Sequence, residues 1–543
     1  MSRSHALRAT LAGLGGVALL ALASCGDGTV TKPASTSPGG ANEVVLNRGN
    51  GAEPKSLDPA VIDLISESQI VGDMLLGLTT EDASSNPIPG AAQSWETSED
   101  GLTWTFHLRD HTWSDGVPVT AEDFVFAWQR LLDPKTAAPY AYYLYPIKNA
   151  RDVAAGRQPL TALGIAATDE KTLVVTLENP LPFMTEFLTH QTTYAVPRHA
   201  IRAKGAEWTR PDNFVSNGPY VLRDWIPDDH VTLVKNHRFY DAANVAIDVV
   251  NYFPTPDGDA ALRRLRAGEL DTQDPIPPLQ IDFLRANMAD ALKITPTLTI
   301  AYASINLARK PLDDVRIREA LNLAVERETL VDRILKLGDL PAYNMVPPGT
   351  ANYPAGVAMR FKTMAFETRV ARAQELMRAA GYTAERPLHI TLATTTNAIT
   401  RQTIAPLQEM WRKIYVDLEI IQSDTQVNYQ KLEDGDFDIG TALWIADYND
   451  PSNFLDVLRT GGGNNYGRYS NKNYDTLLDQ AAAERDLEKR GQTLAQAEQM
   501  MLDDYPAVFV RFQAQPAIVQ PYVRGWVPSS KQINRTRWLT MEK

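Results

Sequence analysis

The feature that most constrains this 543-residue chain is its cysteine content, because Cys25 is its only cysteine. A chain with a single thiol cannot form an internal disulfide, so burial of apolar side chains has to stabilise the fold. Hydrophobic residues make up 44% of the sequence and charged residues 22%, which is typical of globular proteins. At about 150 residues per domain, a chain of this length is expected to form roughly three structural units.

Cys25 follows a segment typical of secretory signal peptides. Arg3 and Arg8 precede an apolar run from Leu11 to Leu22, which is shorter than the ~20 apolar residues that a transmembrane helix needs. The residues before Cys25, Leu-Ala-Ser, complete a string that resembles the bacterial lipobox, whose cysteine is lipidated and becomes the N-terminus. We therefore expect a signal peptide over residues 1–24 and lipidation of Cys25. The alternative is a free cysteine in an ordinary cleaved signal.

The segment after Cys25 is expected to be a flexible tether over residues 25–42. It is rich in Thr, Ser, Pro and Gly and has no apolar periodicity. The protein is therefore expected to be exported to the cell envelope or periplasm, where it contacts the membrane only through its lipid.

Charge and motif content disfavour two classes of function. The formal net charge of −13 argues against a nucleic-acid partner, because phosphate binding needs a concentrated basic surface. The sequence has no Gly-x-Ser-x-Gly elbow, no His-Glu-x-x-His helix and no Walker loop, and its eight histidines lack metal-ligand spacing. We therefore expect no enzymatic activity, no cofactor and no metal.

From Glu43 onward, short strand patterns alternate with helical ones, which predicts α/β architecture. Strands are expected at 102–108, 172–177, 301–307, 388–394, 416–421, 437–445 and 507–512. Helices are expected at 124–132, 315–326, 329–336, 370–380, 473–485 and 487–502. Thr120 and Asp123 are expected to cap the first of these helices.

Several strings together resemble one known family. They are Leu57–Pro59, Trp113–Phe124, Ser216–Tyr220, Asp314–Leu321 and Trp444–Pro451. In this order, from about Glu43 to the C-terminus, the chain resembles the extracellular solute-binding proteins of ABC importers, which include oligopeptide-, dipeptide-, murein-peptide- and nickel-binding proteins. The similarity to the oligopeptide-binding branch is greatest at 133–140 and 338–343.

The resemblance implies a two-lobe, hinged periplasmic-binding-protein fold of the α/β class. Lobe I is expected to comprise 43–75, 200–299 and 515–543, with an extra domain II at 76–199 packed on it, and lobe III is expected at 300–514. Such lobes close around a ligand. The implied partners are a peptide ligand and ABC permease subunits with their ATPases, and the protein is expected to be a monomer.

The resemblance also implies ligand-binding residues. Asp447 matches an aspartate that pairs with the α-ammonium of a peptide through a charge-assisted hydrogen bond. Trp444 and Tyr140 match aromatic positions beside the peptide, and Asp63 matches an acidic position in the cleft. From the residues alone, a solvated loop acid or part of an Asx turn would be the favoured interpretation of Asp447, and the resemblance reverses this preference. The two aromatic residues could belong to the core.

The chain departs from its relatives where they bind the ligand's carboxylate. Positions that are basic in the relatives hold neutral residues here: Leu335, Thr400, Leu432 and Thr441. The bases nearby are Arg309, Lys336, Arg401 and Arg511. Arg511 is expected to share a strand face with Gln513, and both are candidate ligand-binding residues. The partner of Arg511 is either the ligand carboxylate or a structural aspartate.

Four functions therefore remain open. The first is a receptor for peptides of varied side chains. The second, motivated by the missing bases, is a receptor for a modified peptide such as a murein fragment, or for a non-peptide ligand. The third is a peptide sensor or chaperone without transport. The fourth is an exported hydrolase, which the lack of a positioned acid–base pair disfavours.

Overall fold

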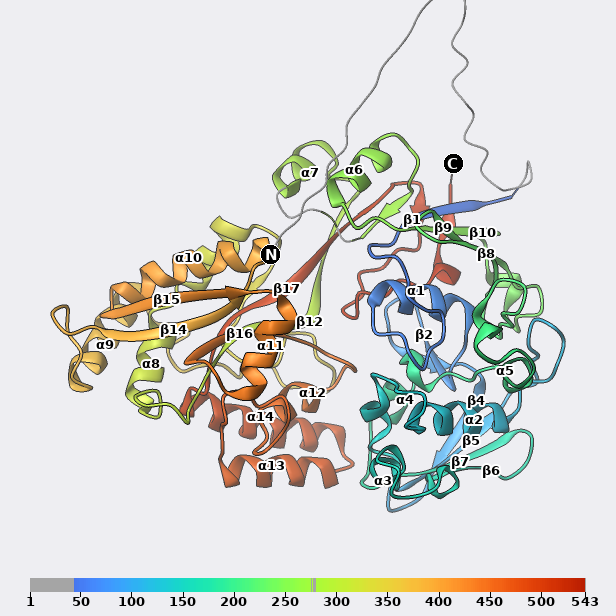
Figure 1. Cartoon of the computed structure of the whole chain (residues 1–543), viewed down its shortest axis with the longest axis horizontal. Coiled ribbons are helices and arrows are strands. Elements are labelled where there is room, and N and C mark those ends of the chain that lie inside the picture. The colour runs from blue at the N-terminus through green and yellow to red at the C-terminus, as the bar shows by residue number, and fades with distance from the viewer. Residues whose placement is uncertain (1–42, 275, 277–279, 543) are drawn as a thin grey trace, which may run out of the picture. The chain divides into compact units, whose positions relative to one another are not determined.

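A computed structural model of the chain describes residues 43–274, 276 and 280–542 (Figure 1). The expected signal peptide, Cys25 and the tether lie outside the described residues. The described part combines helices with one large mixed sheet, so the predicted α/β class is confirmed.

The large sheet has eleven strands in the order β15-β14-β16-β12-β17-β11-β1-β10-β9-β8, with β13 paired to β17. Its strands are β1 (Val45–Gly49), β8 (Tyr220–Ile226), β9 (His230–Lys235), β10 (Val249–Phe253), β11 (Thr272–Gln273), β12 (Leu292–Ile305), β13 (Leu340–Pro341), β14 (Leu388–Thr395), β15 (Val416–Ser423), β16 (Ile439–Ile445) and β17 (Ala507–Val519). β1 and β10 are parallel, as are β14 and β15, whereas β12, β16 and β17 pair antiparallel.

The long strands β12 and β17 connect two separate hydrophobic cores. One core is built from residues between 46 and 252 together with 519–539, and the other from residues between 298 and 512. A smaller core around Leu262, Leu284 and Ile518 lies at the start of β12 and the end of β17. The two strands lie side by side over their length (Figure 1). The described chain is therefore organised as two lobes joined by these strands, while the finer domain boundaries stay predictions.

The ladder between β12 and β17 is interrupted between the two cores. Pro296 pairs with Ala514 and Ile300 with Phe512, so three residues of β12 stand opposite one residue of β17, Gln513. The Thr297 hydroxyl donates to the Gln513 carbonyl at 2.9 Å across this interruption. Such a bulge weakens the ladder locally, which makes this the natural place for the two lobes to bend.

A second, four-stranded sheet belongs to the first core. Its order is β4 (Ala92–Thr97), β5 (Thr103–Leu108), β7 (Thr172–Thr176) and β6 (Ile165–Ala167), and α2 (Ala121–Leu132) packs against it. The helix begins with the predicted capping box, in which the Thr120 N–H donates to the Asp123 carboxylate at 2.9 Å. Short pairs are β2 (Thr79–Glu81) with β3 (Pro87–Pro89) and β18 (Val523–Arg524) with β19 (Thr540–Met541).

The helices of the first core and its neighbourhood are α1 (Ile65–Met74), α3 (Ala150–Ala154), α4 (Met184–Phe187), α5 (Arg198–Lys204), α6 (Gly258–Arg266) and α7 (Ile281–Asn287). Those of the second core are α8 (Val315–Leu323), α9 (Phe366–Ala379), α10 (Ala398–Arg412), α11 (Thr425–Asp434), α12 (Ser452–Leu455), α13 (Lys472–Ala483) and α14 (Leu487–Asp504). α13 and α14 pack against each other (Figure 1).

Several element predictions differ from the structure in type or length. The predicted helix over 315–326 ends at Leu323, and the next segment, Thr329–Leu335, is a π-helix. β12 begins at Leu292, before the predicted start at residue 301, and β17 continues to Val519, past the predicted end at residue 512. Pro296 and Pro516 hid these extensions, because proline is unusual inside a paired strand.

Candidate functional site

A cavity of about 610 Å³ contains two of the predicted ligand residues, Trp444 and Asp447, and is lined from both cores. Phe183 and Phe187 of the first core and Trp444 of the second line it, together with Tyr142 and Asp447. The rest of its wall includes Arg151, Glu178, Asn453, Asp456, Arg459, Asp479 and Arg490. The cavity thus combines aromatic surfaces with charged groups of both signs.

Asp447 lies just after β16 and is half-buried in this cavity. Burial raises the pKa of its carboxyl to about 6, although hydrogen bonds from Asn453 and Tyr142 lower it. The Tyr142 hydroxyl reaches the Asp447 carboxylate at 3.5 Å from the other core. Among the described residues, no Lys or Arg forms an ion pair with Asp447. The carboxylate is therefore positioned to accept a cationic group from a ligand.

Asn453 holds the loop that carries Asp447. Its side-chain oxygen accepts from the Trp444 indole N–H at 2.9 Å and from the Asp447 backbone N–H at 3.3 Å. The buried Asp450 forms a bidentate ion pair with Arg490, with distances of 2.6 and 2.8 Å, and also accepts from the Ser452 N–H at 2.9 Å where α12 begins. These bonds fix the loop from the side of the second core, so Trp444 and Asp447 keep their positions.

Aromatic rings from the first core lie against the same loop. Tyr448 stacks on Phe183 with centroids 5.0 Å apart, and the Arg490 guanidinium lies 4.9 Å from the Phe183 ring centroid. Tyr140 stacks on Tyr142 at 5.5 Å. The site therefore has flat apolar walls, which bind extended organic ligands at a low cost in side-chain entropy.

Tyr140 lies close enough to both Asp447 and Asp63 to interact with them electrostatically. Burial, together with the charges of these two carboxylates, raises the pKa of Tyr140 to about 12. Asp63 is exposed and forms an ion pair with Lys55 at 3.5 Å. The structure thus brings together Tyr140, Trp444, Asp447 and Asp63, and their roles in ligand binding stay predictions.

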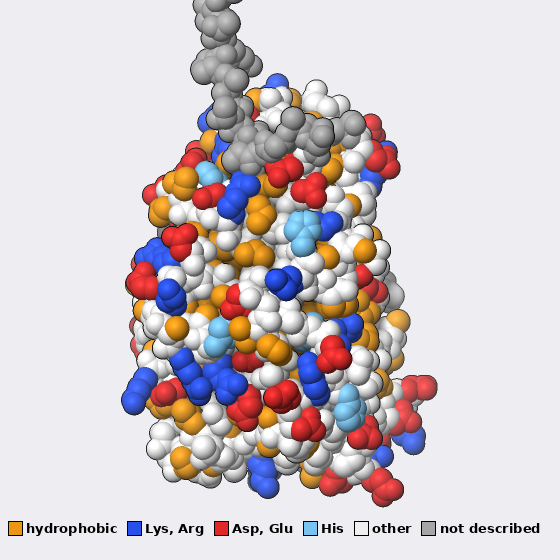
Figure 2. Space-filling view, turned by 90° about the vertical axis from the view of Figure 1, so that its right-hand side faces the viewer, with side chains coloured by type: hydrophobic (Ala, Val, Ile, Leu, Met, Phe, Trp, Pro, Cys, Tyr) orange, Lys and Arg blue, Asp and Glu red, His pale blue; other side chains and the backbone are white. Residues whose placement is uncertain are grey.

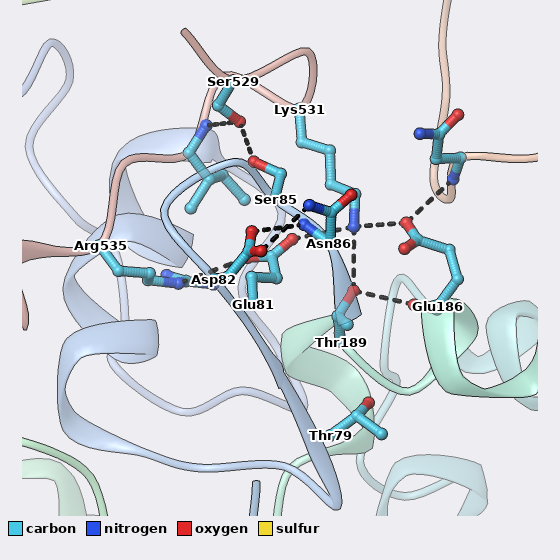
Figure 3. Close-up of polar contacts among 12 residues, drawn as sticks. Thr79, Glu81, Asp82, Ser85, Asn86, Glu186, Thr189, Ser529, Lys531 and Arg535 are labelled. Carbon is cyan, nitrogen blue, oxygen red and sulfur yellow. Dashed lines mark hydrogen bonds and ion pairs between the residues drawn. The ribbon is translucent and has the colours of Figure 1, made fainter. Parts of the chain in front are cut away.

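A buried charge network supports the loop from the first core (Figure 3). The Asn449 N–H donates to the Glu186 carboxylate at 3.2 Å, and Glu186 forms an ion pair with Lys531. The Lys531 ammonium also donates to Glu81 at 2.9 Å and to the Thr189 hydroxyl at 3.1 Å. The C-terminal segment is thereby linked through Lys531 and Glu186 to the loop that carries Asp447.

Neither Arg511 nor Gln513 lines the cavity that contains Asp447. The Arg511 guanidinium is buried and donates to the Asp339 carboxylate at 2.7 Å, while Asp339 also accepts from the Ala514 N–H at 2.8 Å. Of the two partners considered for Arg511, the structure contains the aspartate. Gln513 is half-buried at the interruption between the two cores.

The other bases that were considered for the ligand carboxylate also have partners within the protein. Lys336 pairs with Asp282 at 3.0 Å, and Arg309 pairs with Asp436 at 3.1 Å and Asp438 at 3.4 Å. Arg401 donates to the Thr396 carbonyl at 2.8 Å.

The neutral residues at the four expected basic positions are satisfied within the fold. Leu335 and Leu432 are buried in hydrophobic cores, and the hydroxyls of Thr441 and Thr394 are 3.0 Å apart. Thr400 and Thr395 are joined by a 3.4 Å contact between their hydroxyls.

Tyr142, Tyr448 and Asn453 are site residues that the sequence analysis missed. Tyr448 and Asn453 lie within six residues of Asp447, so their proximity could have been inferred from the loop. Tyr142 approaches from 305 residues away in sequence, and its position next to Tyr140 was the available signal.

None of the described helices is long and apolar enough to cross a membrane. Within the described residues, no cluster of three or more His, Cys, Asp and Glu side chains is arranged to hold a metal ion. On the face drawn in Figure 2, basic and acidic side chains are interspersed with apolar ones.

Two lobes that are joined by long strands, with a cavity lined from both, are typical of a binding-protein fold. Comparison with known proteins agrees. Residues 86–466 match the family model described as bacterial extracellular solute-binding proteins, family 5. The chain belongs to this family.

Individual relatives cover nearly the whole chain. It is 35% identical to the periplasmic oligopeptide-binding protein OppA of Salmonella typhimurium over 491 residues, 90% of each chain. It is 36% identical to the probable deoxycholate-binding periplasmic protein YgiS of Escherichia coli over 492 residues, 90% of this chain and 91% of that one. The unliganded open form of the periplasmic murein tripeptide-binding protein MppA superposes with a TM-score of 0.83 at 30% identity, covering 92% of this chain and 98% of that one. The predicted two-lobe binding-protein fold and the predicted family are confirmed.

Proposed function

We propose that this protein captures peptides between its two lobes and delivers them to an ABC importer. The observation that carries the proposal is the carboxylate of Asp447, half-buried, beside aromatic rings and without a cationic partner among the described residues. A peptide's α-ammonium supplies the missing charge. The oligopeptide-binding relatives support the same ligand class.

The strand edge that leads toward Asp447 supports a peptide over other amines. β14 pairs with β16 through Ile439 and Gly440, and side chains of α11 bond to the next part of that edge: Asn428 donates to the Thr441 carbonyl at 3.2 Å, and the Tyr429 hydroxyl accepts from the Leu443 N–H at 3.2 Å. The part of the edge nearest Asp447, at Ile445, lies beyond these contacts. The Ala446 N–H donates to the Leu298 carbonyl of β12 at 2.9 Å, so alternate residues such as Ile445 direct their backbone groups to the opposite edge. An extended peptide can add to such an edge through main-chain hydrogen bonds.

The second candidate is a modified peptide, such as a murein fragment. Pairing of Arg511 with Asp339 and of Lys336 with Asp282 favours it, because these bases are neutralised within the protein.

Localisation and assembly form part of the same proposal. The relatives named periplasmic support export of this chain. We place the body in the cell envelope as a monomer, anchored through lipidated Cys25, and assign it a transport role rather than catalysis.

Native mass spectrometry of the protein purified without denaturation tests the ligand class. Co-purified peptides, or micromolar binding of short peptides in calorimetry, support the proposal. If neither peptides nor murein peptides bind at millimolar concentration, while the protein is folded by circular dichroism, the proposed function is wrong.

A further inference from the structure

One row of side chains on β16 leads toward Asp447. Side chains alternate across a strand, so Thr441, Leu443 and Ile445 point to one side of β16. The Ala446–Leu298 hydrogen bond continues the ladder past Ile445, and Asp447 follows directly after it. One face of this strand therefore presents, in order, a hydroxyl and two large apolar groups, and the Asp447 carboxylate lies just beyond the end of the strand.

The two apolar members of this row are exposed, although β16 is flanked by β12 and β14. Leu443 is 36% and Ile445 46% exposed, whereas Gly440 and Ala442 on the opposite face are buried. Single exposed apolar side chains are common on proteins, but here two are consecutive in a row that leads to an unpaired carboxylate. A ligand held by Asp447 and extended along β16 would cover both side chains and remove them from water.

At the far end of the row, hydroxyl groups stand where the relatives carry a base. The hydroxyl of Thr441 lies 3.0 Å from that of Thr394 on β14. Of the bases considered for a ligand carboxylate, Arg309, Lys336 and Arg511 are ion-paired with aspartates of the protein, and Arg401 donates to the Thr396 carbonyl at 2.8 Å. A ligand carboxylate over Thr441 would therefore lose water without gaining a cation.

We propose that Leu443 and Ile445 select the ligand, and that the preferred ligand is a peptide with apolar side chains and an uncharged carboxyl end. This rests on the peptide-receptor function proposed above and narrows its substrate class. Asp447 binds the ammonium, the apolar row binds the side chains that follow, and the masked carboxyl end lies beyond Leu443. The amide of a carboxyl-blocked peptide is the simplest ligand of this kind.

Calorimetry with four related peptides tests the selection. They are a leucine-rich tetrapeptide, its C-terminal amide, its N-acetyl form and an all-alanine tetrapeptide. We expect the amide to bind at least as tightly as the free peptide and the alanine peptide to bind about tenfold more weakly, as expected from lost apolar burial. A tenfold or larger loss on amidation overturns the proposal.

Substitutions in β16 test whether Leu443 and Ile445 cause the preference for leucine over alanine. Leu443→Ser combined with Ile445→Ser should abolish the preference for leucine over alanine, whereas Ile226→Ser, at a 49% exposed position on β8, should retain it. Thr441→Arg should add a preference for the free carboxylate over the amide. An unchanged leucine preference in the double variant, with its thermal stability intact, overturns the selection while leaving the receptor function in place. If none of the peptides binds the parent protein, both proposals are wrong.

Discussion

At Asp447, burial and charge act against each other in the free protein. A half-buried carboxylate without a cation loses hydration, and the pKa of Asp447 is raised to about 6 because burial disfavours the ionised form. Asn453 and Tyr142 offset part of this loss by hydrogen bonding. A ligand ammonium compensates the remaining loss of hydration. The Asp447 carboxylate is therefore energetically unfavourable in the free protein and binds the ligand's ammonium in the complex.

Ligand affinity should therefore depend on pH. Binding an ammonium requires the ionised carboxylate, and a pKa of about 6 in the free protein means that below this pH a proton must leave first. Peptide affinity should be highest near pH 7 and fall by up to tenfold per unit below pH 6, since one pKa unit corresponds to about 1.36 kcal/mol. It should also decline from about pH 8 upward, because the α-amino group of the ligand has a pKa of about 7.7–8.0 and must be protonated to pair with Asp447. Calorimetry between pH 5 and 8 measures this. Asp447→Asn should bind weakly and without this dependence, and equal parent affinity at pH 5 and pH 7 would contradict the mechanism.

Sequence alone could place some of these residues but not their partners. Asp447, Trp444 and Tyr140 were inferred because local strings resemble a family. The Tyr142–Asp447 contact and the Arg511–Asp339 pair join residues 305 and 172 positions apart, respectively, and no local pattern encodes such contacts. Whether Arg511 meets a ligand or an aspartate could be decided only once Asp339 was located.

At the scale of elements, one buried ammonium connects three distant segments. Lys531 joins Glu81 at the end of β2 to Glu186 in α4, and Glu186 accepts from Asn449 in the ligand-binding loop. Burial lowers the pKa of Lys531, but the two carboxylates outweigh it and leave the pKa raised. The ammonium therefore stays charged and holds the loop to the first core.

Lys531→Met should destabilise the protein. The substitution keeps most of the volume but leaves Glu186 buried without its cation, while Glu81 retains Arg535 at 3.7 Å. Breaking a buried pair typically costs about 3–5 kcal/mol. Urea unfolding at neutral pH should show a loss of this size. Lys489→Met, which removes an exposed pair with Asp486, is the matched control and should cost about 0–1 kcal/mol. Equal stability of the two variants would contradict the role of Lys531.

The strands were predicted accurately where the apolar pattern of the sequence is uninterrupted. β14 and β15 were predicted to within two residues, since alternating or continuous apolar runs define them. The halves of β12 and β17 that enter the other core were missed. Pro296 and the polar stretch from Gln513 to Gln515 conceal them, yet these residues lie where the two lobes join.

For the whole molecule, two cores joined by β12 and β17 allow closure around a ligand without unfolding either lobe. The bulge opposite Gln513 interrupts the pairing of β12 with β17, so the two strands bend most easily there. The site lies between residues of both cores, so ligand contacts made by both lobes favour the closed state.

The proposed anchor gives a prediction at this scale. If Cys25 is lipidated, the parent protein should fractionate with membranes. Cys25→Ala should be released as soluble protein or remain unprocessed, because its thiol is the only acceptor in the chain. Membrane fractionation with mass measurement of the mature N-terminus checks this. A Cys25→Ala variant that matures and fractionates like the parent would contradict the anchor.

The pairing of Asp447 with a ligand ammonium is tested most directly by a double-mutant cycle. The cycle measures the affinities of a free and an N-acetylated peptide for the parent protein and for Asp447→Asn. Either change alone should cost about 2–5 kcal/mol, the usual penalty for truncating a buried charge pair. Both changes together should cost little more than one, because they remove the same interaction. Equal binding of the free and acetylated peptides by the parent protein would contradict the account.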